Sequence, residues 1–355
     1  MGKGPIRIGI VGLGSWGGTY TRTAIATDGL EIIALCDINL DRANRLIAKE
    51  IFGKAAEPKT YRDYKEMISR ESLDAVFVST LADIRPEIAQ TAMRAGMHVV
   101  VAKPLAKTLI ELEDTISIAS ETDRLLLAGF NFRFRVDAQV TKRFIDKGGL
   151  GDPLFARSWT RTVGIPHWGP HYISNQSGGG SVANTAIHAI DLAHWLFGSP
   201  ELRSAEGVCH SRFPLMPNPP EEWQALLVDY NVEDLSSGYV RYTDGRAMAI
   251  ESTWLSPPEI AGIGVEIWGS AGFASITPLC LITWQNGLYE NRTEEIAPGL
   301  AASFVDDNQV RALREMEHFR DCLFGMTSPL VTLEEMRTTQ AIMENLYTGS
   351  NTVGL

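Results

Sequence analysis

The sequence predicts an α/β fold in which a doubly wound parallel sheet is followed by a second domain with an open-faced, mostly antiparallel sheet and flanking helices. Three observations support this prediction. The chain has 355 residues, more than a single domain usually holds. Short apolar runs alternate with helix-length segments over residues 1–130, which we assign to the first domain. Longer alternating runs joined by tight turns follow over residues 131–355, which we assign to the second.

The strands of the first domain are predicted from continuous apolar runs, because strands covered on both faces lose their polar alternation. These runs are Ile6–Gly12, Glu31–Asp37, Asp74–Thr80, His98–Ala102 and Leu125–Phe130. Helices are expected from Gly17, from the N-cap Asn39 through Phe52, in the segment that ends at Ala95, and over Thr108–Glu121. This alternation of strand and helix predicts βαβ units and a parallel sheet.

The second domain is predicted from alternating runs and turn signals. Residues 154–162 and 223–230 have the pattern of longer strands. Asp244-Gly245 and Asn286-Gly287 each separate two such runs, and both dipeptides tolerate the positive φ of a hairpin turn. Helices are expected over 181–197, 305–324 and 333–347.

Composition argues against several classes of function. The net charge of −11 is unlike that of a nucleic-acid-binding protein, which normally presents a basic face. The four cysteines are far apart and form no C-x-x-C pair, so no metal or redox motif is expected. No apolar run approaches the ~20 residues of a membrane span, and the first residues do not read as a signal peptide. We therefore expect a cytoplasmic protein that binds neither nucleic acid nor membrane.

The first apolar run leads directly into a glycine-rich turn. It reads Gly12-Leu13-Gly14-Ser15-Trp16-Gly17, a G-x-G-x-x-G pattern that follows a strand and opens a helix. The first glycine permits the tight turn, the second lets the backbone approach a pyrophosphate, and the third allows close packing of helix on strand. Free N–H groups at the helix start favour phosphates. All six residues are candidates for dinucleotide binding, which makes the first domain a Rossmann domain.

Asp37 ends the second strand, where a carboxylate can accept hydrogen bonds from a ribose diol. Its charge would repel a 2′-phosphate, so NAD is favoured over NADP, although Arg42 nearby works against that preference. Other strand ends supply further candidates for cofactor contacts, because ligands bind at the carboxyl edge of such sheets. These candidates are Ser79, Thr80, Lys103 and Asn131.

Two segments carry the candidate proton-transfer groups. Lys103 follows the run VVVA, and Pro104 restrains its backbone. Residues 177–198 lead from three glycines into a helix, on which Asn184 and His188 share one face. Lys103 and His188, from different domains, form a candidate proton-transfer pair beside a nicotinamide. The alternative interpretations are a lysine that reaches solvent and a histidine satisfied in the core.

The segment before these glycines is rich in aromatic and polar side chains, which suit a carbohydrate pocket. The candidates for substrate binding are Arg161, Trp168, His171 and Tyr172, with Lys103, Asn184 and His188 from the segments above. A loop with packed aromatic rings is the alternative for this stretch. A metal site would use His167, His171, His188 or His194, but no known ligand set is present, so no metal is expected.

Together these segments resemble the Gfo/Idh/MocA family of NAD(P)-dependent oxidoreductases over nearly the whole chain. The resemblance is carried by GLGSWG at 12–17, CD at 36–37, VVVAKPLA at 99–106, GFNFRF at 129–134, IHAIDLAHWLFG at 187–198 and REMEHFRDCLFG at 314–325. It implies sugar or cyclitol substrates, with Lys103 and His188 matching the family's lysine and histidine. It also implies a homodimer or homotetramer formed through the exposed face of the second sheet.

The chain departs from the family pattern at three places. The family usually has glutamate before the Lys-Pro pair, where this chain has Ala102. It often has aspartate one helical turn before the histidine, where this chain has Asn184. Residues 81–87 read LADIRPE, a segment in which the family usually carries a proline and a later histidine. The loss of two carboxylates predicts a lowered pKa for Lys103.

The main hypothesis is an NAD-dependent dehydrogenase or reductase. It would transfer hydride between nicotinamide and a secondary hydroxyl, or the ketone, of a sugar, cyclitol or glycoside. Two alternatives remain open. One is an NAD-retaining enzyme that cleaves glycosides through transient oxidation, as some relatives in the family do. The other is a non-catalytic regulator that binds NAD or a sugar, which the departures at Ala102 and Asn184 would suit.

Overall fold

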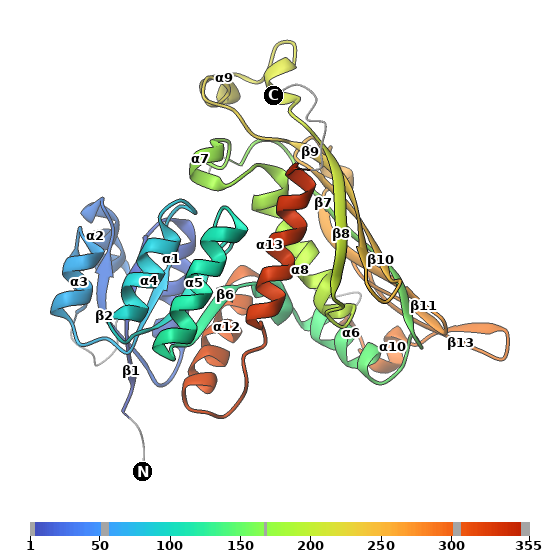
Figure 1. The fold of residues 1–355 in the computed structure, drawn as a ribbon, viewed down its shortest axis with the longest axis horizontal. Helices are drawn as coiled ribbons and strands as arrows, with labels where there is room; N and C mark the ends of the chain where they lie inside the picture. The colour runs from blue at the N-terminus through green and yellow to red at the C-terminus, as the bar shows by residue number, and fades with distance from the viewer. Residues whose placement is uncertain (1–3, 51–56, 167–168, 301–306, 349–355) are drawn as a thin grey trace. The chain divides into compact units, whose positions relative to one another are not determined.

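The computed structural model describes residues 4–50, 57–166, 169–300 and 307–348. Its contacts divide the chain into two units, the first with Met1–Asn131 and Asp307–Leu333, the second with Phe132–Asp306 and Glu334–Leu355. Each unit is built on one sheet, and Figure 1 labels the elements of both. None of the helices in the described ranges has the length and apolar character that a membrane span requires.

The sheet of the first unit has six parallel strands in the order β3-β2-β1-β4-β5-β6. They are β1 (Ile6–Val11), β2 (Leu30–Cys36), β3 (Lys59–Tyr61), β4 (Ala75–Val78), β5 (His98–Ala102) and β6 (Leu126–Gly129). The predicted doubly wound parallel sheet is confirmed, and β3 adds a short edge strand. The strand order reverses at β1 and β4, where ligands bind at the carboxyl edge of such sheets.

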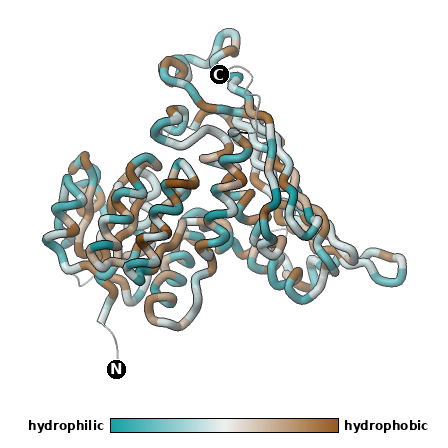
Figure 2. Tube along the Cα trace, in the orientation of Figure 1, coloured by the Kyte–Doolittle hydropathy of each residue, from teal (hydrophilic) through white to brown (hydrophobic). Residues whose placement is uncertain are grey.

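Helices pack beside this sheet, and local capping chemistry explains where they begin. They are α1 (Ser15–Ala26), α2 (Leu40–Lys49), α3 (Tyr64–Arg70), α4 (Arg85–Arg94), α5 (Leu109–Thr122) and α12 (Asn308–Leu323). Asn39 Oδ1 accepts a hydrogen bond from Asp41 N at 3.1 Å, which confirms the predicted N-cap. Thr108 and Glu111 form a reciprocal capping box. In Figure 2, apolar and polar positions alternate around these helices, as expected when one face packs on a sheet.

Helix α12 does not follow the predicted domain boundary. The prediction places all of residues 131–355 in the second domain, whereas α12 belongs to the first unit. Its buried side chains Met316 and Phe319 enter the core that holds Tyr20 and Phe77. The rings of Phe77 and Phe319 meet edge to face, with centroids 5.1 Å apart. Periodicity identifies this helix, but it does not indicate which sheet buries its apolar face.

The sheet of the second unit has eight strands in the order β14-β13-β12-β11-β7-β10-β9-β8. They are β7 (Pro153–Arg161), β8 (Leu202–His210), β9 (Leu235–Tyr242), β10 (Ala247–Thr253), β11 (Gly262–Gly269), β12 (Gly272–Ile276), β13 (Leu279–Gln285) and β14 (Leu288–Asn291). Every pairing is antiparallel except that of β7 with β10, so the mostly antiparallel prediction is confirmed.

The helices of the second unit are α6 (Val136–Asp146), α7 (Ser174–Ser177), α8 (Ile187–Leu196), α9 (Glu221–Leu227), α10 (Thr293–Ile296) and α13 (Leu333–Thr348). Short 3₁₀ turns lie at η1 (Asn131–Phe134), η3 (Phe213–Leu215) and η4 (Pro258–Ile260). The predicted helix over 181–197 begins with a π-helical turn, η2 (Val182–Ala186), before α8 continues it. Figure 1 shows α8 and α13 on one face of the sheet.

Both predicted hairpins of the second unit are confirmed. Strands β9 and β10 pair around Asp244-Gly245, and β13 and β14 pair around Asn286-Gly287. Asn286 and Gly287 have φ values of 52° and 79°, which a two-residue hairpin turn requires.

The predicted strand over 223–230 is wrong, because helix α9 occupies most of this segment. Two glutamates stand in its first turn, where negative charge favours a helix start. Trp223, Leu226 and Leu227 pack on one apolar cluster. Their spacing of three and four residues is helical, so the segment's apolar period is that of a helix and not of a strand.

Candidate active site

The glycine-rich turn between β1 and α1 has the geometry of a phosphate-binding loop. Gly12 has a φ of +87°, and a Cβ there would lie 2.7 Å from Thr80 N. A Cβ on Gly17 would lie 1.9 Å from Gly12 O, so helix and strand are closer than any side chain allows. By contrast, no atom lies within 4 Å of a Cβ built on Gly14. The open space over Gly14, at the start of α1, fits a pyrophosphate.

Asp37 is buried at the carboxyl end of β2 and is held by backbone N–H groups. Leu13 N donates to its Oδ2 at 2.7 Å, and Asn39 N donates to its Oδ1 at 2.8 Å. Arg42 Nη1 lies 3.4 Å from Oδ2. The N–H of Leu13 is therefore directed at Asp37, and the carboxylate stands where ribose hydroxyls are bound in dinucleotide sites.

Arg85 bonds to the chain just after β4 and just after β5, and no motif in the sequence indicates this role. It is buried, and its Nε donates to Thr80 O at 2.9 Å while its Nη1 donates to Pro104 O at 2.6 Å. Ser79 Oγ donates to Gly12 O at 2.6 Å. The structure thus places Ser79 and Thr80 beside the glycine-rich turn and brings a cation to the same edge of the sheet.

Lys103 follows β5 at this edge, and its side chain is half-buried. Burial, and then the positive charge of Arg85, lower the pKa of Lys103 to about 7. The predicted lowering of this pKa is confirmed, with causes that the sequence does not reveal. An amine with such a pKa is partly neutral near pH 7, so it can accept a proton.

Asn131 lies two residues beyond the end of β6, the last strand of the first sheet, and its side chain is buried. Among the described residues, its Oδ1 has no hydrogen-bond partner. Buried amide oxygens of this kind are rare, and such an oxygen suits a donor group on a bound ligand. Ser15 and Trp16 form the first turn of α1. Together with Asp37 and Lys103, these residues fit a dinucleotide at the carboxyl edge of the sheet.

A buried carboxylate lies near Ala102, where the family usually has glutamate. A Cβ on Gly129, the neighbour of Ala102 in β6, would lie 3.3 Å from Ala102 Cα and 3.3 Å from Glu315 Oε1. Burial raises the pKa of Glu315 to about 8, although Tyr20 and Arg311 lower it in part. No pattern in the sequence points to this group, because Glu315 reaches the sheet only through the packing of α12.

In the second unit, the structure brings Asn184 and His171 together. His171 Nδ1 lies 2.7 Å from Asn184 Oδ1. Asn184 Nδ2 donates to Gly179 O at 2.8 Å and to Gly180 O at 2.9 Å. Asn184 is buried and His171 is half-buried. The pair therefore joins the loop before the glycines to the start of the helix that carries His188.

Glu233 holds the same helix start and is missing from the predicted site. Gly180 N and Val182 N each donate to its carboxylate at 2.8 Å, and Tyr347 Oη donates to it at 3.0 Å. Burial raises the pKa of Glu233 to about 7, although these hydrogen bonds lower it in part. The carboxylate satisfies N–H groups that a helix start leaves without partners. The π-helical turn that it supports is a feature frequent at functional sites.

His188 lies in the first turn of α8 and is half-buried. Its ring stacks on Phe132, with centroids 4.4 Å and planes 15° apart. Because His188 belongs to the second unit and Lys103 to the first, their pairing stays a prediction. Asp191, one turn further along, is fully buried, and its Oδ1 lies 2.7 Å from Arg133 Nη2. Asp191 therefore serves the interior of the second unit.

Arg161 is a predicted substrate residue that the structure does not bring to Asn184 and His188. Thr160 and Ser252 are buried on the face of the sheet that the helices cover, with hydroxyls 3.0 Å apart. Since side chains alternate along a strand, Arg161 points to the opposite face. There its Nη2 lies 3.2 Å from Glu251 Oε2.

The remaining candidates lie in the loop before the glycines. Tyr172 packs against the apolar cluster that includes Phe213 and Trp254. Trp168 and His167 lie outside the described residues. Within the described ranges, no group of three or more His, Cys, Asp or Glu side chains is arranged to hold a metal ion.

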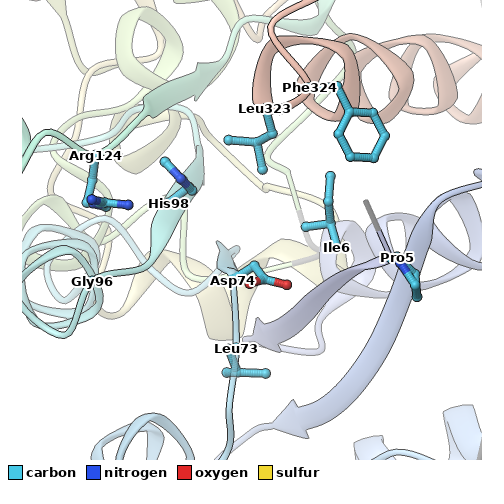
Figure 3. Close-up of a pocket in the computed structure, with 10 residues that line it drawn as sticks. Pro5, Ile6, Leu73, Asp74, Gly96, His98, Arg124, Leu323 and Phe324 are labelled. Atoms are coloured by element: carbon cyan, nitrogen blue, oxygen red, sulfur yellow. The ribbon is translucent and has the colours of Figure 1, made fainter. Parts of the chain in front are cut away.

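A separate cavity lies at the other edge of the first sheet. Figure 3 shows Asp74, His98 and Arg124 around it, with the apolar side chains of Ile6 and Leu323. Its volume is about 430 Å³. Ile6 and His98 begin β1 and β5, so the cavity lies where the strands start. Ligands of doubly wound sheets bind at the opposite edge, and this cavity is therefore distinct from the candidate site.

Known proteins resemble the chain over most of its length. D-glucoside 3-dehydrogenase of Escherichia coli (strain K12) is 26% identical and aligns with 99% of this chain and 97% of its own. The scyllo-inositol 2-dehydrogenase (NAD(+)) of Bacillus subtilis (strain 168) is 26% identical over 92% of this chain and 89% of its own. A solved structure of levoglucosan dehydrogenase in complex with NADH superposes with a TM-score of 0.81 at 19% identity, covering 97% of this chain and 96% of that one. This last likeness concerns the fold.

Two family models match the chain in sequence. Residues 6–130 match the model of an oxidoreductase family with an NAD-binding Rossmann fold. Residues 138–275 match the model of the GFO/IDH/MocA C-terminal domain. The two matches cover most of the chain, in the order of the two sheets described above. The chain therefore belongs to the GFO/IDH/MocA family of oxidoreductases.

Proposed function

We propose that the protein is an NAD-dependent dehydrogenase or reductase that acts on a secondary hydroxyl, or the corresponding ketone, of a sugar, cyclitol or glycoside. The observation that carries this proposal is Lys103, with a pKa lowered to about 7, at the same sheet edge as the complete dinucleotide loop. Relatives named as glucoside and inositol dehydrogenases support the substrate class.

The residues of the first unit would hold the cofactor. N–H groups at the start of α1 would meet the pyrophosphate over Gly14, and Asp37 would accept hydrogen bonds from the ribose. Ser79 and Thr80 follow β4, and Asn131 follows β6, at the same edge of the sheet. When bound, NAD would supply the acceptor for the hydride that leaves the substrate carbon.

Lys103 and His188 would handle the proton of the substrate hydroxyl. The neutral amine of Lys103 accepts that proton, and its pKa makes this form available near neutral pH. His188 is half-buried on α8 and would bind or relay from the substrate side. Trp168 and Tyr172 remain proposed contacts for the substrate, whereas Arg161 does not, because it pairs with Glu251 on the opposite face of the sheet.

We also propose that the protein is cytoplasmic and assembles as a homodimer or homotetramer through the face of the second sheet away from α8. That face carries the ion pairs of Arg157 with Glu251 and Glu266, with N–O distances of 2.6 Å and 3.7 Å. The rings of Phe155 and Trp268 pack beside them at a tilted angle, with centroids 5.4 Å apart. Sedimentation analysis would test the assembly, and a monomer at all concentrations would exclude it.

The activity is tested by mixing the protein with NAD and a panel of glucosides, inositols and free sugars. The reduced cofactor is followed by its absorbance, and released sugar is followed in parallel. Accumulation of reduced cofactor supports the proposal. Released sugar without net reduction would instead indicate a glycoside-cleaving enzyme, and binding without either product would indicate a regulator.

A further inference from the structure

The cavity where the strands of the first sheet start has a polar side and an apolar side. Figure 3 shows Arg124 and His98 on one side and apolar side chains on the other, with Asp74 between them. All the residues that line the cavity belong to the first unit. Its volume of about 430 Å³ is in the usual range of small-molecule sites. A ligand that fills it must therefore be small and must carry both polar and apolar groups.

His98 supplies a hydrogen-bond donor on the polar side. The backbone N–H of Leu125 donates to His98 Nδ1 at 2.9 Å, so this ring nitrogen accepts and carries no hydrogen. In the neutral imidazole the hydrogen then lies on Nε2, the nitrogen on the other side of the ring. Burial, and then the positive charge of Arg124, lower the pKa of His98. The ring is therefore neutral near pH 7, and its Nε2–H is an uncharged donor.

Arg124 and Asp74 supply opposite charges beside this donor. Arg124 Nε donates to Thr122 O at 3.1 Å, whereas its two terminal nitrogens have no partner among the described residues. Asp74 Oδ2 accepts from Arg7 N at 2.7 Å, and its Oδ1 likewise has no partner in the described ranges. Arg124 is half-buried and Asp74 is exposed. Both side chains can therefore bind a ligand without losing a contact within the protein.

The apolar side is formed by Ile6, Leu323 and Phe324, which we call the apolar wall. Ile6 begins β1 and is buried, whereas Leu323 ends α12 and, like Phe324, is half-buried. The two half-buried side chains leave apolar surface in contact with water. A ligand whose apolar group covers this surface gains free energy from its burial.

We propose that this cavity is a binding site for an α-amino acid with an apolar side chain. Its carboxylate would accept hydrogen bonds from His98 and Arg124, and its ammonium group would pair with Asp74. Its side chain would lie against the apolar wall. A simple carboxylic acid would bring a second negative charge to Asp74, and a simple amine would bring a second positive charge to Arg124, and like charges in contact weaken binding. The charges of the cavity therefore favour a molecule that carries both groups.

Calorimetric titration of the full-length protein tests this class of ligand. L-phenylalanine, 3-phenylpropionate and phenethylamine share one aromatic group and carry both charges, the carboxylate alone or the ammonium alone. We expect L-phenylalanine to bind about tenfold more tightly than either of the others, and glycine, which lacks the apolar group, to bind more weakly than all three. If either single-charge compound binds as tightly as L-phenylalanine, the proposed class is wrong. If none of the four compounds binds, the site itself is refuted.

Variants show whether the ligand binds in this cavity. Arg124→Gln removes the charge that meets the carboxylate, so the affinity for L-phenylalanine should fall about tenfold. Asp74→Asn keeps an acceptor for Arg7 N and should weaken binding of L-phenylalanine but not of 3-phenylpropionate. Arg94→Gln removes an exposed cation at the end of α4 and is the matched control. If L-phenylalanine binds Arg124→Gln and Asp74→Asn as tightly as the parent, it binds elsewhere and the inference is wrong.

Saturating NAD distinguishes this site from the cofactor site. Ligands of doubly wound sheets bind at the carboxyl edge, whereas the cavity lies where β1 and β5 start. L-phenylalanine should therefore bind with the same affinity whether or not NAD is present. Complete displacement of L-phenylalanine by NAD would place it at the carboxyl edge and overturn the inference. Since none of these titrations needs turnover, the amino-acid site and the proposed dehydrogenase function can fail separately.

Discussion

The candidate residues form two sets, one in each unit, which we call the first half and the second half, and the two sets hold their polar groups by different means. In the first unit, the buried cation Arg85 bonds to the ends of β4 and β5, and Lys103 beside it has a pKa lowered to about 7. In the second unit, the neutral amide of Asn184 bonds to two carbonyl oxygens and to His171. The buried carboxyl group of Glu233 accepts hydrogen bonds from the N–H groups of Gly180 and Val182 at the start of the same helix.

The difference shows that the two lost carboxylates have unlike consequences. At Ala102, the loss leaves Lys103 with a cation as its charged neighbour, which favours the neutral amine. At Asn184, the replacement fixes the direction of hydrogen bonds, because an amide has separate donor and acceptor ends. The first half therefore determines the protonation state of Lys103, and the second half determines the orientation of the Asn184 amide.

The largest effect is expected from Lys103→Ala, which removes the proton acceptor of the first half. General bases contribute about 10²–10⁴-fold, so we expect kcat to fall about a thousandfold. Affinity for NADH, measured by quenching of protein fluorescence, should fall much less than kcat, because the glycine-rich turn and Asp37 are untouched. Lys107→Ala, on the same loop, is the matched control. If Lys103→Ala has the activity of the parent, Lys103 is not the proton acceptor, and proton transfer then depends on residues of the second half alone.

A smaller effect is expected from Asp37→Ala, which acts on cofactor binding in the first half only. Hydrogen bonds to charged groups contribute about 1.5–3 kcal/mol, which corresponds to a loss of about 10–100-fold in NAD affinity. Calorimetric titration with NAD and NADP measures it, with Asp41→Ala as the control. The affinity for NADP should fall less, because removal of the Asp37 carboxylate also removes its repulsion of the 2′-phosphate. A parent protein that prefers NADP would refute the assignment of Asp37.

The sequence predicts the first sheet well because its strands are buried on both faces and read as apolar runs. The predicted strand His98–Ala102 has the bounds of β5, and the turn at Asp244-Gly245 is equally local chemistry. The prediction of secondary structure fails where tertiary packing, and not the local sequence pattern, determines the element. Residues 223–230 show an incomplete alternation, and only the cluster under Trp223 reveals their helical period.

The candidate site divides in the same way. The glycine-rich turn, Asp37 and Lys103 lie in local motifs, so sequence alone suffices to nominate them. Glu315 and Glu233 act through side chains or backbone groups far away in the chain, which no local pattern encodes. For Arg161, the sequence does not determine the face of the sheet on which the side chain lies. Alternation separates it from Thr160, but the sequence does not indicate which face the helices cover.

Arg85→Gln tests whether charge sets the protonation state of the first half. Burial is the larger cause of the lowered pKa of Lys103, and the charge of Arg85 is the second. Removing that charge should raise this pKa, so the rise of kcat with pH, expected at about 7 in the parent, moves to higher pH. At pH ~7 the activity should fall about three- to tenfold, since one pKa unit is tenfold in the ratio of protonation states.

Arg85→Lys retains the positive charge and is the matched variant for this test. Its pH–rate profile should stay near that of the parent, even if the hydrogen bonds to Thr80 and Pro104 are weaker. The informative quantity is the difference between the two variants in the midpoint of the profile. Equal midpoints in Arg85→Gln and the parent would mean that burial alone lowers the pKa of Lys103.

The smallest effect is expected from Glu233→Gln, and it is an effect on stability in the second half. Glutamine has one acceptor oxygen, so one of the N–H groups of Gly180 and Val182 would lose its partner. Leaving a buried donor unsatisfied costs about 1–3 kcal/mol of the free energy of unfolding. Glu222→Gln, exposed on α9, is the matched control.

The pH dependence of this loss of stability shows whether Glu233 is ionised or protonated in the folded chain. Burial raises the pKa of Glu233 to about 7 in the folded chain, against about 4.3 in an unfolded one. The folded state keeps a proton there that the unfolded state has lost, so this group's contribution to the free energy of unfolding falls as pH rises from about 4 to about 7. Denaturant titrations across this range should show a flatter pH dependence in Glu233→Gln than in the parent and in Glu222→Gln. If the slopes are equal, Glu233 is ionised throughout the range, and the second half would then depend on a buried charge as the first half does.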